Sequence, residues 1–304
     1  MNPISLKPNY APQADTCYIG VGLRHQHFQE ALAGSSSIDF AEVHAENFFA
    51  DGGIASAFLD QFSDLYDISL HSTSMGLGSA TGVNHNYLKR LNQLIKRTYP
   101  VLISDHASFA WSQNNNRDIH AGDLLPLEFS PASLEVLIEN TDRAQQILGH
   151  QLLIENVSAY VDLDHSSLQE TEFLVTAVER SNSKLLVDLN NLLVNERNAG
   201  STDPLARAKQ WLEAIPHHLV GEIHLAGYSV SSDFTIIIDD HSQAVSNECW
   251  ELYRFALQRF GSIPTLIEWD NELPSWQRLV AEADKAREIF SQVFTQAGGR
   301  THVG

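Results

Sequence analysis

The sequence predicts an α/β fold in which eight parallel strands, alternating with helices, close into a single barrel. Eight short apolar runs are distributed over the 304 residues. Segments with helical periodicity separate them, and this alternation indicates a parallel sheet with crossover helices. Eight strands favour a closed barrel over an open sheet, and the chain length fits a barrel of about 250 residues with insertions.

The strands are predicted from runs rich in aliphatic residues, each too short to be a helix of ordinary length. In chain order the runs are 18–24, 39–47, 68–72, 101–106, 152–157, 185–191, 221–227 and 264–270. All but the first contain, at or near the end, a histidine or an acidic residue that can bind a metal ion. The first run ends at Arg24 and lacks an obvious ligand.

The helices are predicted from amphipathic spacing and from start signals. Leu88, Leu91 and Leu94 lie three residues apart, as on one side of a helix. Ser130 followed by Pro131 is a typical N-cap and first helical residue. The predicted helices are 54–65, 87–97, 131–148, 168–180, 204–215, 247–260 and 274–294.

Two long connections follow the fourth and seventh strands, at 107–129 and 227–246. Long ordered loops in compact domains are often lids or binding loops, and in a barrel these two would hang over the catalytic mouth. We therefore expect Trp111 in the first loop and Tyr228 in the second to contact the substrate.

The bulk composition indicates a soluble, cytoplasmic globular protein. The chain has 38 acidic and 19 basic side chains and a formal net charge of −19, which argues against a nucleic-acid or membrane-surface partner. Cys17 and Cys249 form no zinc or disulfide pattern, and no stretch resembles a secretory signal or a membrane span. Without a linker or repeat, the chain is predicted to be one domain, 1–304, whose core of about 17–296 lies between a short N-terminal arm and a frayed C-terminal tail.

Imidazoles and carboxylates recur at the predicted strand ends. Because a parallel barrel places the carboxyl ends of its strands at one mouth, we expect these side chains to surround one pocket. Histidine and carboxylate ligands without cysteine suit iron, manganese or zinc. With Asp239 and His241 on the second long loop, they are numerous enough for two or three metal ions, which two-metal sites hold roughly 3.5–4 Å apart. The strand-end candidates are His44, His71, His106, Glu155, Asp188, His224 and Glu268.

Each candidate also has a structural interpretation. A single buried histidine or glutamate at a strand end is more often a hydrogen-bond or salt-bridge partner than a ligand. Together, however, buried carboxylates at one site need a compensating cation, which favours a metal centre. Arg24 and His27 follow the first strand, where they could bind a substrate or form a surface salt bridge. Asn156 and Asn191 follow ligand candidates and could bind a substrate or a metal, or simply close a turn.

Ten stretches of the sequence match one known family, in the order in which that family has them. They are GVGLRHQHF, DFAEVHAENFFADGG, ISLHSTSMGLGSA, ISDHASFAW, DLLPLEFS, LLIENVSAY, LLVDLNNLLVN, EIHLAGYS, IIIDDH and PTLIEWDNELPSW. Through them, over almost its whole length, the chain resembles the multinuclear non-heme iron-dependent oxidative enzymes. The resemblance implies a triosephosphate-isomerase-type (TIM) barrel with two or three iron ions and dioxygen as oxidant. It also implies a cysteine-containing, ribosomally made precursor peptide as substrate, and a separate partner protein that binds the peptide's leader.

The ligands also resemble those of xylose-isomerase-like barrels, among them the trinuclear abasic-site endonucleases. This resemblance implies three metal sites, two of which share a bridging glutamate. The first is His71, His106 and Glu155; the second is Glu155, Asp188, His224 and Glu268; the third is Asn191, Asp239 and His241. Asn191 departs from the histidine of the endonucleases, which implies a loosely held third metal. His44 is an additional ligand or substrate contact, and with Glu155 and Asp188 it is predicted to be catalytic.

The leading hypothesis is therefore oxidation of a peptide cysteine in natural-product biosynthesis. The products that the family implies are an oxazolone–thioamide, a thiooxazole, or a cysteine that has lost its β-carbon. Manganese or zinc could replace iron in the purified protein.

Three alternatives remain open. A di- or trinuclear phosphodiesterase uses similar ligands, although the acidic charge disfavours DNA as its substrate. A sugar isomerase of the xylose type relies on an active-site lysine, and none follows a predicted strand. A non-catalytic metal-binding module fits poorly with two long loops at the mouth of a barrel.

Overall fold

The structure is a computed structural model that describes residues 16–34, 37–50, 52–115, 117–161, 163, 166–233 and 235–298. The predicted N-terminal arm and the predicted tail beyond residue 298 lie outside the described residues. Eight parallel strands form a closed barrel in the order β1–β12–β9–β8–β7–β4–β3–β2, which confirms the predicted barrel class. The strands are β1 (Ile19–Gly22), β2 (Phe40–His44), β3 (Asp67–His71), β4 (Leu102–His106), β7 (Leu153–Glu155), β8 (Lys184–Asp188), β9 (Val220–Leu225) and β12 (Thr265–Ile267).

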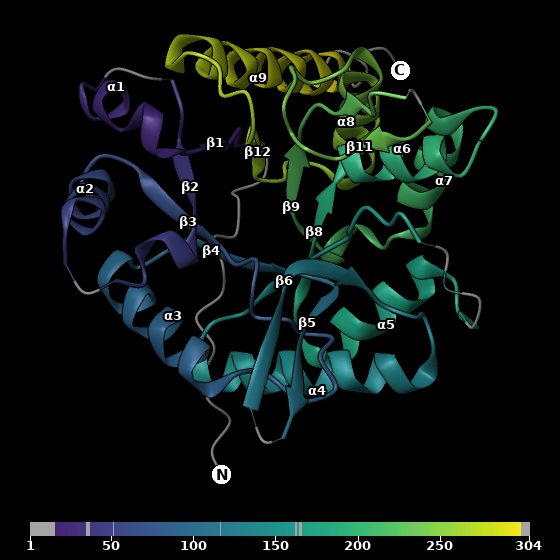
Figure 1. The fold of residues 1–304 in the computed structure, drawn as a ribbon. Coiled ribbons are helices and arrows are strands. Elements are labelled where there is room, and N and C mark those ends of the chain that lie inside the picture. The colour runs from purple at the N-terminus through teal and green to yellow at the C-terminus, as the bar shows by residue number, and fades with distance from the viewer. Residues whose placement is uncertain are drawn as a thin grey trace. The chain divides into compact units, whose positions relative to one another are not determined.

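Helices alternate with these strands along the chain (Figure 1). Each of the predicted helices is present: those at 131–148 and 247–260 have the predicted ends, and the others differ at one or both ends by up to four residues. The helices are α1 (Phe28–Leu32), α2 (Ile54–Ser63), α3 (His85–Thr98), α4 (Pro131–Leu148), α5 (Glu170–Ser181), α6 (Leu189–Asn198), α7 (Pro204–Ala214), α8 (Asn247–Phe260) and α9 (Trp276–Gly298). Short 3-10 turns lie at η1 (His25–His27), η2 (Ala45–Phe48) and η3 (His217–Leu219). Ser130 caps α4 as expected, its hydroxyl accepting from the backbone N–H of Ser133.

The predicted strand over 185–191 is wrong at its C-terminal end. The strand stops at Asp188, whose carboxylate accepts a hydrogen bond from the backbone N–H of Asn191 at 2.7 Å and so caps α6. Aspartate is among the preferred N-cap residues because its side chain binds an otherwise unpaired helix N–H. The apolar run continues into the helix because the first turns of α6 are buried. In a run that is buried on all sides, the change from the two-residue period of a strand to the 3.6-residue period of a helix cannot be seen.

The described chain divides into two compact units, with the divisions inside β2 and β8. Unit 1 contains the described part of 43–186, and unit 2 contains that of 16–42 and 187–298. The prediction of a single domain stays a prediction.

Unit 1 is organised around the parallel strands β3, β4 and β7. Their register places His71 beside Ser104, and His106 beside Glu155, at the carboxyl ends of the strands. The side chains of Leu70, Ile103 and Ile154 pack in the interior of the unit, where all are fully buried. The same strands therefore supply the core and, at their carboxyl ends, the polar groups.

In unit 2 the strands β1, β9 and β12 are paired in parallel. His224 of β9 lies beside Leu266 of β12, and the backbone N–H of Glu268 donates to the carbonyl of Leu225 at 2.9 Å. These contacts place His224 and Glu268 on neighbouring strand ends.

An antiparallel hairpin, β5 (Ser108–Asn114) and β6 (Arg117–Pro126), occupies the segment predicted only as a long connection. Its base is fastened to the loop after β3. The hydroxyl of Ser79 accepts from the backbone N–H groups of Ala110 and Trp111, each at 3.1 Å, and the Trp111 indole donates to the Ser74 carbonyl at 2.7 Å. A second small ribbon, β10 (Ser229–Val230) with β11 (Ile237–Ile238), lies in the other long connection.

Among the described residues, no helix combines the length and the apolar character that a membrane span requires.

Candidate metal centre

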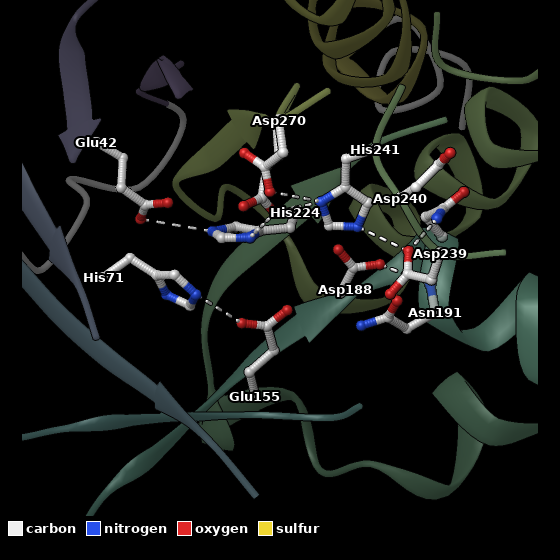
Figure 2. A network of polar contacts seen from close by, with 12 residues as sticks. Glu42, His71, Glu155, Asp188, Asn191, His224, Asp239, Asp240, His241 and Asp270 are labelled. Carbon is white, nitrogen blue, oxygen red and sulfur yellow. Dashed lines mark hydrogen bonds and ion pairs between the residues drawn. The ribbon is translucent and has the colours of Figure 1, made fainter. Parts of the chain in front are cut away.

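Three strand ends of unit 1 bring together the His71 cluster, which we define as His71, His106 and Glu155. The Glu155 carboxylate oxygen Oε2 lies 3.5 Å from His71 Nε2 and 3.3 Å from His106 Nε2. Both distances exceed a normal N–H···O hydrogen bond of about 2.7–3.2 Å. They match ligands that share one ion, because atoms about 2.0–2.2 Å from a metal lie about 3–3.6 Å apart at ordinary bond angles. Figure 2 shows His71 and Glu155 pointing toward each other.

The groups behind the His71 cluster hold its rings in place. His71 Nδ1 is 2.7 Å from the Ser104 hydroxyl, which leaves Nε2 directed at Glu155. Asp105 accepts from the backbone N–H groups of Met75 and His106, at 2.9 and 2.6 Å, and its Oδ1 lies 3.9 Å from His106 Nδ1. Burial raises the pKa of Asp105 well above its ordinary value, and Glu46 raises it further. A ligand whose other nitrogen is bound keeps one tautomer and one orientation.

The His224–His241 cluster lies in unit 2. Two overlapping groups of candidate ligands there share Glu268. Within each group the ligand atoms all lie within 4.8 Å of one another. Oε2 of Glu268 is 3.1 Å from His224 Nδ1 and 3.3 Å from His241 Nδ1. The groups are Glu42, His224 and Glu268, and Asp188, His241 and Glu268.

Two acidic residues of this cluster were not among the sequence predictions. His224 Nε2 lies 3.6 Å from Glu42 and 3.7 Å from Glu222, both fully buried (Figure 2 shows the first pair). Each acid precedes a predicted ligand by two residues, and residues two apart on a strand face the same side. The alternation in FAEVH and GEIHL could therefore have revealed Glu42 before His44, and Glu222 before His224.

Asp188, Asn191 and the loop residues Asp239 and His241 lie near the start of α6. Asp239 accepts a hydrogen bond from the Asn190 side chain at 2.8 Å, and it lies 2.7 Å from His241 Nε2. His241 has a left-handed backbone conformation, with φ of +47°, that turns its ring toward Asp239 and Glu268. The predicted trio of Asn191, Asp239 and His241 is thus gathered around the cap of one helix (Figure 2).

The charge of the His224–His241 cluster suits a cation. Burial raises the pKa of Asp188 to about 7, and burial likewise raises that of Glu222 to about 7. Burial opposes protonation of His224, yet Glu42, Glu222 and Glu268 raise its pKa well above the ordinary value. Crowded buried carboxylates that favour protons also favour a metal ion in their place. The donor set, all imidazole nitrogen and carboxylate oxygen, fits iron, manganese or zinc.

The residues predicted to bind substrate have internal contacts. Arg24 is paired with Asp270 and Glu268, and His27 Nε2 is 3.0 Å from the Pro274 carbonyl. The Tyr228 ring lies 5.6 Å from the Arg197 guanidinium carbon. Of the other residues predicted to bind substrate, Trp111 lies at the base of the hairpin and Asn156 is buried directly after Glu155. His44 is partly exposed, and its ring centroid is 5.8 Å from that of His71. Substrate binding by these residues stays a prediction.

Replacing Gly227 with Ala is expected to destabilise the protein by about 1–3 kcal/mol, as overpacking commonly does. A Cβ atom at this position would clash with the backbone carbonyls of Gln243 and Ala244, which follow His241 in the chain. Backbone atoms cannot move aside as the end of a flexible side chain can. Thermal unfolding of the metal-free variant measures the loss, and an unchanged melting temperature would contradict the prediction.

Comparison with known proteins places the chain among related sequences. A UPF0276 protein of Chromobacterium violaceum is 40% identical over 272 residues, covering 89% of this chain and 94% of that protein. A UPF0276 protein of Vibrio vulnificus is 41% identical over 275 residues, covering 90% and 91%.

Solved structures confirm the fold alone, because their sequence identity is low. An L-ribulose 3-epimerase has a TM-score of 0.60 at 14% identity, covering 95% of this chain and all of its own. Endonuclease IV from Thermus thermophilus has a TM-score of 0.55 at 15% identity, covering 92% of this chain and 99% of its own. A xylose isomerase-like TIM barrel protein from Mycobacterium smegmatis, solved with magnesium, has a TM-score of 0.56 at 14% identity, covering 88% of each chain.

The pattern of one enzyme family matches residues 18–291, nearly the whole of the described structure. This range includes every strand of the barrel and both candidate clusters. By this match the chain belongs to the MbnB/TglH/ChrH family of enzymes that modify the precursors of ribosomally synthesised and post-translationally modified peptides (RiPPs).

Proposed function

We propose that this protein is an iron-dependent oxidase that uses dioxygen to modify a cysteine of a RiPP precursor peptide. Membership of the family supports a precursor peptide as substrate. The observation that carries the choice of cofactor is the pair of buried ligand clusters, each made only of imidazoles and carboxylates. Iron bound there would supply a coordination site for the substrate thiolate and the redox capacity to use dioxygen.

The residues of the two clusters have distinct tasks in this proposal. His71, His106 and Glu155 hold one ion on three strand ends whose register fixes their spacing. Asp188, His224, His241 and Glu268 hold at least one more, with Asn191 and Asp239 beside them. His44, partly exposed and next to His71, contacts the peptide or the ion.

The peptide must reach the clusters in a defined orientation. We propose that Trp111 and Tyr228, with Asn156, contact the core of the peptide, and that a separate protein presents its leader. The fastened base of the β5–β6 hairpin supports a positioning role for Trp111, because a rigid anchor can hold a flexible chain at low entropic cost.

The test offers the protein a cysteine-containing RiPP precursor peptide, which is to be sought among the reading frames next to its gene. Protein loaded with Fe²⁺ and supplied with air is expected to change the mass of the peptide, whereas anaerobic protein, metal-free protein and a Cys→Ser peptide are expected to give no change. Metal analysis is expected to find at least two iron ions per chain. A mass change without dioxygen would contradict the oxidase, and cleavage of abasic-site DNA by zinc-loaded protein would favour the phosphodiesterase instead.

A further inference from the structure

Arg24, at the end of β1, is buried against two carboxylates of unit 2. Its Nε donates to Asp270 Oδ1 at 2.8 Å, and its Nη2 donates to the same oxygen. Nη2 also lies 3.4 Å from Glu268 Oε1. The side chain is only 9% exposed, so the guanidinium is part of the interior.

The opposite oxygens of the same two carboxylates face one imidazole. Glu268 Oε2 lies 3.3 Å from His241 Nδ1, and Asp270 Oδ2 lies 3.4 Å from that nitrogen. Glu268 Oε2 is also 3.1 Å from His224 Nδ1. Arg24 therefore contacts the outer oxygen of each carboxylate, and the inner oxygens are presented to the His224–His241 cluster.

The permanent positive charge of Arg24 is unexpected next to Glu268, a candidate ligand of a metal cation. By Coulomb's law Arg24 repels a metal ion held by Glu268, so its charge alone weakens metal binding. The planar fork of a guanidinium, however, holds carboxylate oxygens in fixed directions, which a lysine ammonium does not. The benefit of Arg24 must then lie in geometry.

We propose that Arg24 is a positioning residue of the metal centre: by holding the outer oxygens of Glu268 and Asp270, it makes each carboxylate offer one inner oxygen to the ion. This inference rests on the proposed metal-dependent function. Without the guanidinium, each carboxylate is free to rotate or to bind with both oxygens, and the coordination of the ion changes.

The test uses Co²⁺ as a probe in the full-length protein, since its visible absorption reports coordination number. The variants are Arg24→Gln, which removes both the positive charge and the planar guanidinium, and Arg24→Lys, which keeps the charge but removes the planar guanidinium. Positioning predicts that both lower the affinity of one of the cobalt-binding steps by about 10-fold or more and alter its spectrum, as loss of a ligand's supporting partner does. Charge alone predicts the opposite for Arg24→Gln, namely tighter binding.

A third variant moves the guanidinium without changing any charge. A Cβ atom on Gly22 would lie 3.2 Å from Arg24 Nη1 and 3.3 Å from Nη2. Gly22→Ala is therefore expected to shift the fork by a few tenths of an ångström and to alter the cobalt spectrum in the same direction as Arg24→Lys, with a smaller loss of affinity.

The matched control is Arg287→Gln. Arg287 forms a more exposed salt bridge with Asp39, at 2.7 Å, and neither residue is a candidate ligand. This variant is expected to lower thermal stability and leave both cobalt-binding steps unchanged. If Arg24→Gln does not fold, the double variant Arg24→Gln, Asp270→Asn also removes the carboxylate charge that Arg24 no longer balances, and it is expected to show the same altered spectrum.

The outcomes separate this inference from the proposed function. Wild-type affinity and spectrum in Arg24→Gln, in the double variant, or in Arg24→Lys would overturn the positioning role while leaving the metal centre intact. Tighter cobalt binding in Arg24→Gln would overturn it too. Failure of the wild-type protein to bind Co²⁺ or Fe²⁺ at all would overturn the proposed function instead.

Discussion

Replacing Glu155 with Gln is expected to abolish peptide modification and to empty the His71 cluster of metal. Glu155 Oε2 is the atom that both His71 and His106 face, at 3.5 and 3.3 Å. Glutamine keeps the size of the side chain and removes its negative charge. Because loss of an outer partner of a ligand already costs 10–100-fold in metal affinity, loss of the ligand charge is expected to cost at least about 100-fold. Iron content per chain and kcat/KM on the peptide measure both effects.

The control for this variant is Glu135→Gln on α4 in the same unit. Glu135 pairs with Arg180 on the surface, and its exposed position predicts no change in iron content or activity. Metal-free Glu155→Gln is expected to be at least as stable as the wild type, since it no longer buries a charge. Full iron occupancy in Glu155→Gln would show that Glu155 is not a ligand.

Asp188→Asn is expected to remove metal from the His224–His241 cluster without unfolding helix α6. Asp188 caps this helix through Oδ1, and asparagine is as good an N-cap as aspartate. The substitution therefore separates the two tasks of the side chain. We expect a loss of metal affinity of at least about 100-fold. The melting temperature of the metal-free variant is expected to equal or exceed that of the wild type at a pH of about 8, above the raised pKa of Asp188. Both quantities are measured on the same sample by titration and thermal unfolding.

The stability of the wild type and that of Asp188→Asn are expected to depend on pH differently, with a defined sign. Burial raises the pKa of Asp188 from 3.8 to about 7 in the folded, metal-free protein. The folded state thus binds a proton that the unfolded state has released between about pH 4 and 7, so the stability from this group is present at low pH and lost as pH rises through about 7. Asp188→Asn is expected to lack this part of the decline. Metal binding must displace the proton, so wild-type affinity is expected to rise with pH up to about 7.

Asp203→Asn is the matched control, because Asp203 is also an N-cap aspartate of unit 2. Its Oδ1 accepts from the backbone N–H of Ala206 at 3.0 Å, at the exposed start of α7. The variant is expected to keep the metal content and the pH profile of the wild type. If Asp203→Asn flattened the pH profile as strongly as Asp188→Asn, the assignment to Asp188 would be wrong.

The barrel could be predicted from the sequence because its strands are short, apolar and separated by amphipathic helices. The gathering of the candidate ligands could be predicted because histidines and acids follow these strands, and metal binding by them stays a prediction. Glu42 and Glu222 were missed because each lies inside its run, where a carboxylate looks like an interruption of the strand rather than a second ligand-side residue. Recognising them needs the two-residue alternation of strands to be applied within the run as well as at its end.

Other features depended on contacts that are distant in sequence. The β5–β6 hairpin was predicted as a loop because its strands are polar and largely exposed, with a register shift after Phe109 that breaks the alternation. Arg24 was expected to bind a substrate or to form a salt bridge, and the sequence did not identify its partners Glu268 and Asp270, which are 244 and 246 residues away. A single sequence carries little local information about such pairs.

The length of helix α6 fixes the distance between Asp188 and the strand that precedes Asp239 and His241. The helix begins after Asp188 and ends at Asn198, whose side chain donates to the carbonyl and accepts from the N–H of Ile237, in the strand that leads into Asp239 and His241. Ten residues of helix span about 15 Å, and inserting one residue turns everything beyond it by about 100°. An insertion or deletion within α6 would thus displace the loop that carries Asp239 and His241 even though both residues remained, so length variation in this protein should be confined to other segments.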